Sequence, residues 1–221
     1  MFGKKNYVIE PKAVDENVLI QMSEPTEISK KTKITVPPQY KAYVFVDFKH
    51  LCRVEPCVNM EFVKTYGKEY IGKRLQIAFV ANRTIAQSGW GFGNIQVNNE
   101  ALKEAYRIGA NGKFSINIVD HVVLISSFPN SSEITIDQIR EKTLSTIKTI
   151  GTPILAEYFS KTTTSVFEMS SLVSDFRDKF MDSLQNEKIF GNMGIKISML
   201  TVDGFHANED DLELIRNRIN A

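Results

Sequence analysis

The stretch Gly89–Gly93, which reads Gly-Trp-Gly-Phe-Gly, is the first candidate for chemistry, because glycine-rich loops can hold the phosphates of a nucleotide. A dinucleotide loop needs the spacing Gly-x-Gly-x-x-Gly between a strand and a helix whose amino terminus faces the pyrophosphate. Here the spacing is Gly-x-Gly-x-Gly, the segment NIQVNN that follows has a strand pattern, and the stretch lacks the Lys-Ser or Lys-Thr pair of a P-loop. The pattern therefore favours a strand corner that buries or displays Trp90 and Phe92, and we expect no cofactor.

Cys52 and Cys57, with His50 beside them, offer three ligands for zinc. Structural zinc takes four ligands, and the other two histidines, His121 and His206, are distant and isolated in the sequence. We therefore expect two reduced thiols near the end of a strand, and no metal.

Asp120 and His121 have the residue types with which a carboxylate orients a catalytic imidazole. Neighbouring residues of a strand point to opposite faces, so we expect a surface pair at the end of a strand instead. With three histidines and no nucleophile motif, the sequence indicates no catalytic site and predicts that the protein is not an enzyme.

The charge balance gives no bulk attraction to nucleic acid or to an anionic membrane, because 27 basic and 26 acidic residues leave a formal net charge of +1. We expect no nucleic-acid partner. The basic run Lys30, Lys31 and Lys33 leaves open a weak contact with lipid headgroups or an acidic protein. No apolar run reaches about 18 residues, and no signal peptide is recognised, so a cytoplasmic chain with no span of its own is expected.

Strand patterns fill the first half of the chain. NVLIQM, TKITV and RLQIAFVAN are rich in apolar residues, and YKAYVFVDF carries apolar side chains on both faces, which predicts a strand covered on both sides. In AYRIGANGKFSINIVD, Asn111-Gly112 lies between alternating apolar runs and predicts a hairpin turn. A slightly bulged pair is the alternative, because GANG offers two turning points.

Helical spacing begins near residue 131. Thr135 and Gln138 form a predicted capping box, and Ser165 with Glu168 forms a second box that begins another helix. The sequence Gly-Thr-Pro at residues 151–153 is expected to interrupt the first helix and to cap a fresh turn.

A late strand, IKISMLTV, and a terminal helix capped by Asn208 complete the pattern. Leu212, Ile215 and Ile219 form an apolar seam on that helix, too short to establish a coiled coil. Many strands, two helices, one strand and one helix predict an α+β fold, with helices packed against a mainly antiparallel sheet.

Three segments, ITVPPQYKAYVFVDFK, WGFGNIQV and RIGANGKFSINIVDHVVLI, together resemble the SPFH (Band 7; stomatin–prohibitin–flotillin) superfamily, and most of all its soluble virion-core-like bacterial branch. The first is similar to the family's entry strand and the second to a Trp-Gly-Thr motif with an Ile-x-Val strand. The third is similar to a hairpin in which five residues match: Ala110, Gly112, Phe114, Ile118 and Asp120. Pro38 and Phe92 depart from the family pattern, in which a turn glycine and a small hydroxyl residue stand.

The resemblance covers residues 28–221. It divides the chain into an N-terminal extension with an edge strand (1–27), an SPFH-like domain (28–205) and the start of a C-terminal helix or truncated coiled coil (206–221).

The resemblance implies a non-enzymatic scaffold that self-assembles and organises partner proteins at the inner face of the membrane, in some relatives during envelope stress. Its partners would be its own copies and membrane proteins or other membrane-recruited proteins, so its membrane contact would be indirect. The expected contacts are Trp90 and Phe92, if exposed, and Leu212, Ile215 and Ile219. A structural component of a phage or other particle with the same fold is the alternative, and a small-molecule enzyme with an unrecognised pocket is the second.

Overall fold

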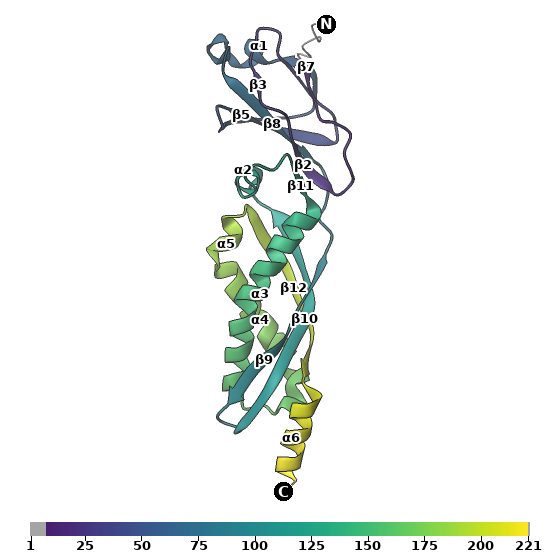
Figure 1. Cartoon of the computed structure of the whole chain (residues 1–221), viewed down its shortest axis with the longest axis vertical. Coiled ribbons are helices and arrows are strands. Elements are labelled where there is room, and N and C mark those ends of the chain that lie inside the picture. Colours follow the sequence, from purple (N-terminus) through teal and green to yellow (C-terminus); the bar gives the residue numbers. More distant parts are fainter. Residues whose placement is uncertain (1–7, 221) are drawn as a thin grey trace. The chain divides into compact units, whose positions relative to one another are not determined.

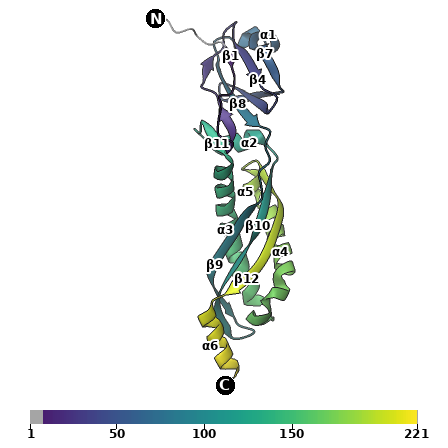
Figure 2. The same ribbon diagram turned by 90° about the vertical axis from the view of Figure 1, so that its right-hand side faces the viewer.

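The strands and helices group into two units in the computed structural model, which describes residues 8–220 (Figures 1 and 2). Unit 1 extends to Thr84 and includes Asp120–Ile139, whereas unit 2 comprises Ile85–Val119 and the chain from Arg140 onward. The strand pairs are antiparallel except for one, and helices pack against the sheets. The α+β class predicted from the sequence is therefore confirmed, and the predicted domain 28–205 contains parts of both units.

Unit 1 contains two sheets. One has the strand order β11-β2-β8-β5-β6, with β3 also paired to β8, and the other has the order β1-β4-β7. Its elements are β1 (Val8–Ile9), β2 (Val18–Met22), β3 (Thr26–Glu27), β4 (Lys33–Val36), β5 (Tyr40–Val46), β6 (Lys49–Val54), β7 (Cys57–Glu61), α1 (Phe62–Tyr66), the short 3-10 helix η1 (Lys68–Tyr70), β8 (Arg74–Ala81), α2 (His121–Ser126) and β11 (Glu133–Thr135).

β5 and β8 form the centre of unit 1 and are buried on both faces. On one face, Ala42 and Val44 join a core that includes Phe62 of α1. On the other face, the Tyr43 ring stacks on His121 of α2. A strand covered on both sides, as YKAYVFVDF predicts, is therefore confirmed.

β2 has a neighbour on each side, β11 and β8, and Val18, Leu19 and Ile20 are buried. The strand that the sequence suggested at an edge of the N-terminal extension is thus an interior strand, because its apolar residues supply core on both faces.

Unit 2 contains a three-stranded sheet with the order β12-β10-β9, and α3 and α4 lie along one face of it (Figures 1 and 2). Within residues 8–220, β9 and β12 pair only with β10, so each has a free edge. The elements are β9 (Ser88–Asn99), β10 (Glu104–Ile118), α3 (Ile136–Lys161, of which 136–139 group with unit 1), the 3-10 helix η2 (Val166–Leu172), α4 (Val173–Asn186), α5 (Lys188–Gly191), β12 (Ile195–Ala207) and α6 (Glu209–Ile219).

β10 runs as one strand of 15 residues through Asn111 and Gly112, so the predicted hairpin turn is wrong. Two-residue hairpins of the Asn-Gly type need positive φ at both residues, and neither residue has it here. Gly112 instead permits close approach, because a Cβ there would lie 1.9 Å from the carbonyl oxygen of Thr201 and 2.9 Å from the Trp90 ring. A register shift against β12 falls between Asn111 and Gly112.

The glycine cluster lies within β9, so the predicted strand corner is also wrong. Ile95 pairs with Ile108, and Phe92 pairs with Ala110, so that Gly93 and Asn94 together oppose a single residue of β10. Asn94 has φ of +57°. The glycines therefore mark a β-bulge, which adds one residue to a continuing strand.

α3 continues through Gly151 and Pro153, although an interruption was expected there. Proline in a helix interior costs about 3 kcal/mol, which the burial of Leu155 and Phe159 beyond it offsets. A Cβ on Gly151 would lie 2.7 Å from the Phe180 ring and 2.8 Å from Phe92, so this glycine lets the helix approach the sheet. Although α3 is 26 residues long, neither it nor any other helix in residues 8–220 has the length and apolar run needed to cross a bilayer.

The first predicted capping box is formed, whereas at the second position Ser165 caps only the 3-10 helix η2, and α4 begins after Leu172 without a side-chain cap. Thr135 N donates to Gln138 Oε1 at 2.9 Å, and Gln138 N donates to Thr135 Oγ1 at 3.1 Å, which confirms the first capping box. The Oγ of Ser165 accepts from Phe167 N at 3.4 Å, and η2 precedes α4 there. Asn208 caps α6 by accepting from the Asp211 N–H, as predicted.

We predict that Gly112→Ala lowers the free energy of unfolding of unit 2 by about 2 kcal/mol, because the added methyl group overpacks the contact with Thr201 and Trp90. The free energy of unfolding is measured by denaturant titration, with the fluorescence of the single tryptophan as the signal, since Trp90 lies in unit 2. Gly89→Ala is the matched control, because its Cβ would meet only the Gly112 oxygen at 3.9 Å. Equal unfolding midpoints for the two variants would contradict the close approach.

Candidate functional site

Trp90 packs inside unit 2, and its side chain is only 4% exposed. Its Nε1 donates to the Thr201 oxygen at 3.0 Å, and its ring centroid lies 5.1 Å from Phe92 and 5.4 Å from Phe180. Phe92 is half-buried and its ring lies 6.2 Å from that of Phe180. Of the two arrangements considered from the sequence, the buried one holds for Trp90, so this cluster supports the fold and does not display an aromatic contact.

The C-terminal helix α6 is fixed to β10 through Arg107. The guanidinium donates to Asp211 through Nε at 2.9 Å and Nη2 at 3.0 Å, and Nη2 also donates to Asn208 Oδ1 at 2.9 Å. The Arg107 N–H donates to Asp211 Oδ2 at 2.8 Å, and Asn208 N donates to the Arg107 oxygen at 2.9 Å. One arginine therefore sets the start and direction of α6 relative to the sheet.

Asp211 is the acidic partner of this clamp. The Arg107 guanidinium holds the pKa of the Asp211 carboxyl below its usual range, chiefly through the side-chain hydrogen bonds. The sequence signalled the acidic first turn of α6 but not its partner, since Arg107 lies 104 residues earlier.

The seam expected on α6 is divided between core and surface. Ile215 is 3% exposed and packs inside unit 2, Leu212 is half-buried, and Ile219 is 65% exposed. Leu212 and Ile219 are seven residues apart and so share a face, to which Phe167 of η2, 40% exposed, adds an aromatic ring. We call Phe167, Leu212 and Ile219 the C-terminal patch. Leu214 is also exposed, but five residues from Ile219 it faces another direction.

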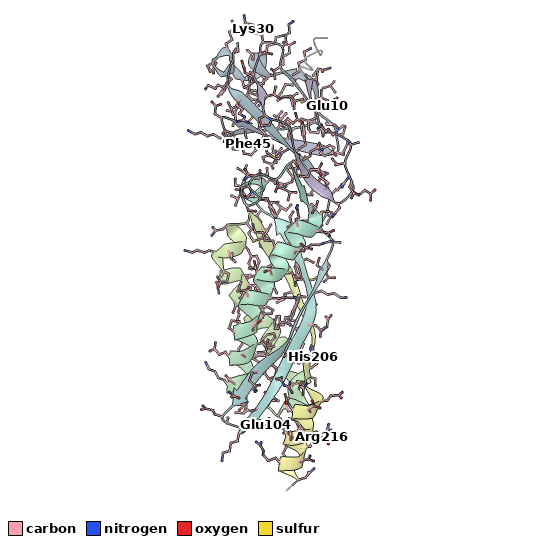
Figure 3. All side chains as sticks on the ribbon, in the orientation of Figure 1. Glu10, Lys30, Phe45, Glu104, His206 and Arg216 are labelled. Atoms are coloured by element: carbon pink, nitrogen blue, oxygen red, sulfur yellow. The ribbon has the colours of Figure 1, made fainter. Side chains whose placement is uncertain are left out.

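The charged side chain of Arg216 borders the C-terminal patch. The Arg216 guanidinium carbon lies 5.1 Å from the Phe167 ring centroid, and Phe167, Arg216, Ile219 and Asn220 line a hollow of about 220 Å³. An apolar patch with a charged border is suited to contact with another protein surface and supplies no acid, base or nucleophile of its own. Figure 3 labels Arg216 on α6.

Asp120 follows the end of β10 and is exposed, as expected, and it caps α2 in unit 1. His121 begins that helix and is half-buried, so the expected surface position does not hold for the histidine. Asp120 Oδ1 accepts from Val122 N at 2.8 Å and from Val123 N at 3.0 Å. The His121 ring stacks on Tyr43 with centroids 5.2 Å apart, and its Nδ1 lies 3.0 Å from the Tyr43 hydroxyl. Sequence reasoning missed this pair, because Tyr43 is 78 residues away.

Burial lowers the pKa of His121, and Lys41 and Arg53 lower it further, whereas Asp120 opposes them. Burial also raises the pKa of Tyr43. A neutral imidazole beside a tyrosine that is harder to ionise is a packing and hydrogen-bonding contact, since proton transfer is favoured by groups whose pKa lies near the working pH.

The two cysteines lie on different strands, Cys52 on β6 and Cys57 at the start of β7. Cys57 Sγ is 3.8 Å from the Ile34 oxygen. In the region from 8 to 220, no group of three or more His, Cys, Asp or Glu side chains is placed to hold a metal ion. His206 lies over Gly109 of the unit 2 sheet, where any Cβ would come within 2.2 Å of its Nε2.

Two surface grooves are the places where the alternative function, a small-molecule enzyme, would need its active site. In unit 1, a groove of about 480 Å³ lies between the β5–β8 face and the segment after α2, with Phe45, Arg74 and Gln76 in its lining. In unit 2, a groove of about 690 Å³ lies beside α3 and α4. There the Tyr158 hydroxyl donates to Asp175 at 2.7 Å, and burial followed by this bond raises the pKa of Tyr158. That pKa moves away from neutrality, which does not favour acid–base work at this site.

We predict that His121 titrates below its ordinary pKa of about 6.5. Because the folded pKa is lowered, the stabilisation of unit 1 from neutral His121 is complete above about pH 6.5. It is lost as pH falls toward the lowered pKa. Proton NMR of the imidazole Cε1–H follows the titration. The resonance that is absent from the spectrum of the His121→Gln variant is the one that belongs to His121. A midpoint at or above pH 6.5 would exclude the buried contact with Tyr43.

We also predict that Asp211→Asn speeds amide hydrogen exchange in α6 roughly tenfold, the effect of losing one charge-assisted hydrogen bond. In the wild type the clamp persists in mild acid and is lost only as pH falls through the lowered pKa of Asp211. Asp210→Asn is the control, because this neighbour is exposed and the hydrogen bonds of Arg107 run to Asp211 and Asn208. Exchange that is unaffected in the Asp211 variant would mean that Arg107 does not hold the helix.

No protein-family model and no curated protein matches this chain. The likeness to SPFH proteins therefore rests on the sequences of residues 34–49, 90–97 and 107–125.

Proposed function

We propose that this protein is a non-enzymatic scaffold of the SPFH type, which associates with its own copies and organises partner proteins at the inner face of a membrane. Self-association is assigned to the C-terminal patch, and attachment to the membrane is assigned to partner proteins.

The observation that carries the proposal is the C-terminal patch on a helix whose start is fixed. Ile219 is 65% exposed and Phe167 is 40% exposed, on neighbouring elements that share one hollow. Apolar side chains gathered at one place on a surface favour contact with another protein. Apolar residues that are exposed singly are common on protein surfaces and would not indicate a contact site.

Rigidity adds to the case. The Arg107–Asp211 clamp orders α6 before any contact forms, so association does not have to meet the entropic cost of ordering the helix. Ile215 lies on the same stripe of α6 as Leu212 and Ile219. This stripe runs from the core at Ile215, which is buried, to the surface at Ile219.

The membrane part of the proposal rests on the resemblance to SPFH proteins. The organisation of partners follows from that resemblance too, since side-by-side assembly presents many copies of one surface to a second protein.

We predict that Phe167→Asp combined with Ile219→Asp weakens self-association at least about 30-fold, or 2 kcal/mol, because two charges would enter an apolar contact. Size-exclusion chromatography with light scattering over a dilution series gives the mass and the dissociation constant. Val58→Asp combined with Val119→Asp is the matched control, since these valines are 78% and 59% exposed and lie outside the C-terminal patch.

A wild-type protein that stays monomeric at every concentration, and is missing from the membrane fraction of cells, would overturn the proposal. A self-associating protein that is missing from the membrane fraction would instead favour the particle component considered as the alternative.

A further inference from the structure

One end of unit 1 carries a group of exposed lysines drawn from three segments of the chain. They are Lys30 and Lys31 before β4, Lys64 on α1, and Lys68 and Lys73 on either side of Ile71. We propose that this group, the lysine end, binds directly to a lipid surface with anionic headgroups. The contact goes beyond the proposed function, which attaches the protein to the membrane through partners alone.

Backbone hydrogen bonds bring the three segments together. Gly72 N donates to the Ile28 oxygen at 2.9 Å, and Phe62 N donates to the Thr32 oxygen at 3.0 Å. Lys73 N donates to the Tyr70 oxygen at 3.0 Å, which closes the turn that presents Ile71. Figure 3 shows Lys30 at the end of unit 1 where Figure 1 places α1. The lysines therefore share one end of the unit although up to 43 positions separate them in the sequence.

The lysine end is much more basic than the chain as a whole. Residues 27–33 and 61–73 contain six basic and three acidic side chains, a formal charge of +3, whereas the complete chain has +1. The remainder of the chain is consequently net negative. This asymmetry would direct the lysine end toward an anionic surface and turn the rest of the charge away from it.

Ile71 and Tyr70 add apolar surface within the lysine end. Ile71 is 39% exposed, and the Lys73 ammonium lies 4.9 Å from the Tyr70 ring centroid. Apolar and aromatic side chains among lysines are typical of segments that lie at the boundary between headgroups and acyl chains. The combination favours a lipid surface over a purely electrostatic contact.

The chemistry of the basic residues distinguishes lipid from an acidic protein or nucleic acid. All five members are lysines, whose compact charge on a flexible stem suits a diffuse layer of headgroups. Arginine, which forms paired hydrogen bonds to one carboxylate or phosphate, would be expected in a site for a specific acidic ligand. Arg74 follows Lys73, but its guanidinium carbon lies 5.1 Å from the Phe48 ring centroid, at the tip between β5 and β6.

The test is co-sedimentation of the protein with phosphatidylcholine vesicles, with and without phosphatidylserine. We expect binding only with phosphatidylserine. It should be lost near 1 M salt, where the screening length is about 3 Å. Lys30→Gln, Lys68→Gln and Lys73→Gln together should lower the partition coefficient on the order of 100-fold, since each lysine contributes roughly fivefold.

The matched control replaces three exposed lysines of unit 2, Lys113, Lys148 and Lys196, with glutamine. It changes the net charge equally and should leave vesicle binding unchanged. Ile71→Ser should weaken binding by a smaller factor that persists when the salt concentration varies, because it removes apolar contact alone. Circular dichroism confirms that each variant is folded before its binding is compared.

Several results would overturn the inference. One is equal binding to vesicles with and without phosphatidylserine. Another is an equal loss of vesicle binding in the two triple lysine variants. A third is binding to polyglutamate or duplex DNA by a protein that does not bind vesicles. Light scattering of the same samples reports self-association separately. A wild-type protein that forms oligomers but does not bind phosphatidylserine vesicles would therefore reject the lysine end and leave the proposed scaffold standing.

Discussion

Close packing around Trp90, made possible by two residues without side chains, is the constraint on which unit 2 depends. Gly112 lets β10 pass beneath the indole and beside β12, and Gly151 lets α3 approach the rings of Phe92 and Phe180. In an interior packed this densely, an added methyl group strains the neighbouring side chains and backbone. The sheet and the helices meet at this packed cluster. The cluster therefore also stabilises the position of β10, the strand from which Arg107 binds Asp211 of α6.

The two surfaces to which we assign function differ in physical character and lie in different units. The C-terminal patch is apolar, so burial of area would dominate its contacts and salt would affect them little. The lysine end is electrostatic, so each copy would hold lipid weakly and salt would release it. Assembly would present many such ends together, and several weak contacts would then give firm attachment without a covalent anchor or a membrane-spanning helix.

The sequence predicted the fold class, the buried strand β5, and the caps at Thr135 and Asn208, since each follows from local spacing or from neighbouring side chains. It failed at Gly112, where a glycine that permits close approach was interpreted as a turn, and at Pro153, where distant packing outweighed a local breaker. Arg107–Asp211 and Tyr43–His121 were missed because only the tertiary fold joins them. The lysine end was partly visible as the run at Lys30, but its other segments required the β3–β8 pairing.

The free edges of β9 and β12 affect how copies of the protein would meet. A long, flat edge invites a further strand to add to it, which leads to uncontrolled aggregation. Here the bulge at Gly93 and Asn94 bends one edge, and the register shifts of β10 against β12 interrupt the regularity of the other. Irregular strands of this kind are poor templates. The contacts that we propose between copies would thereby be left to surfaces made of side chains, which can be specific and reversible in a way that backbone pairing is not.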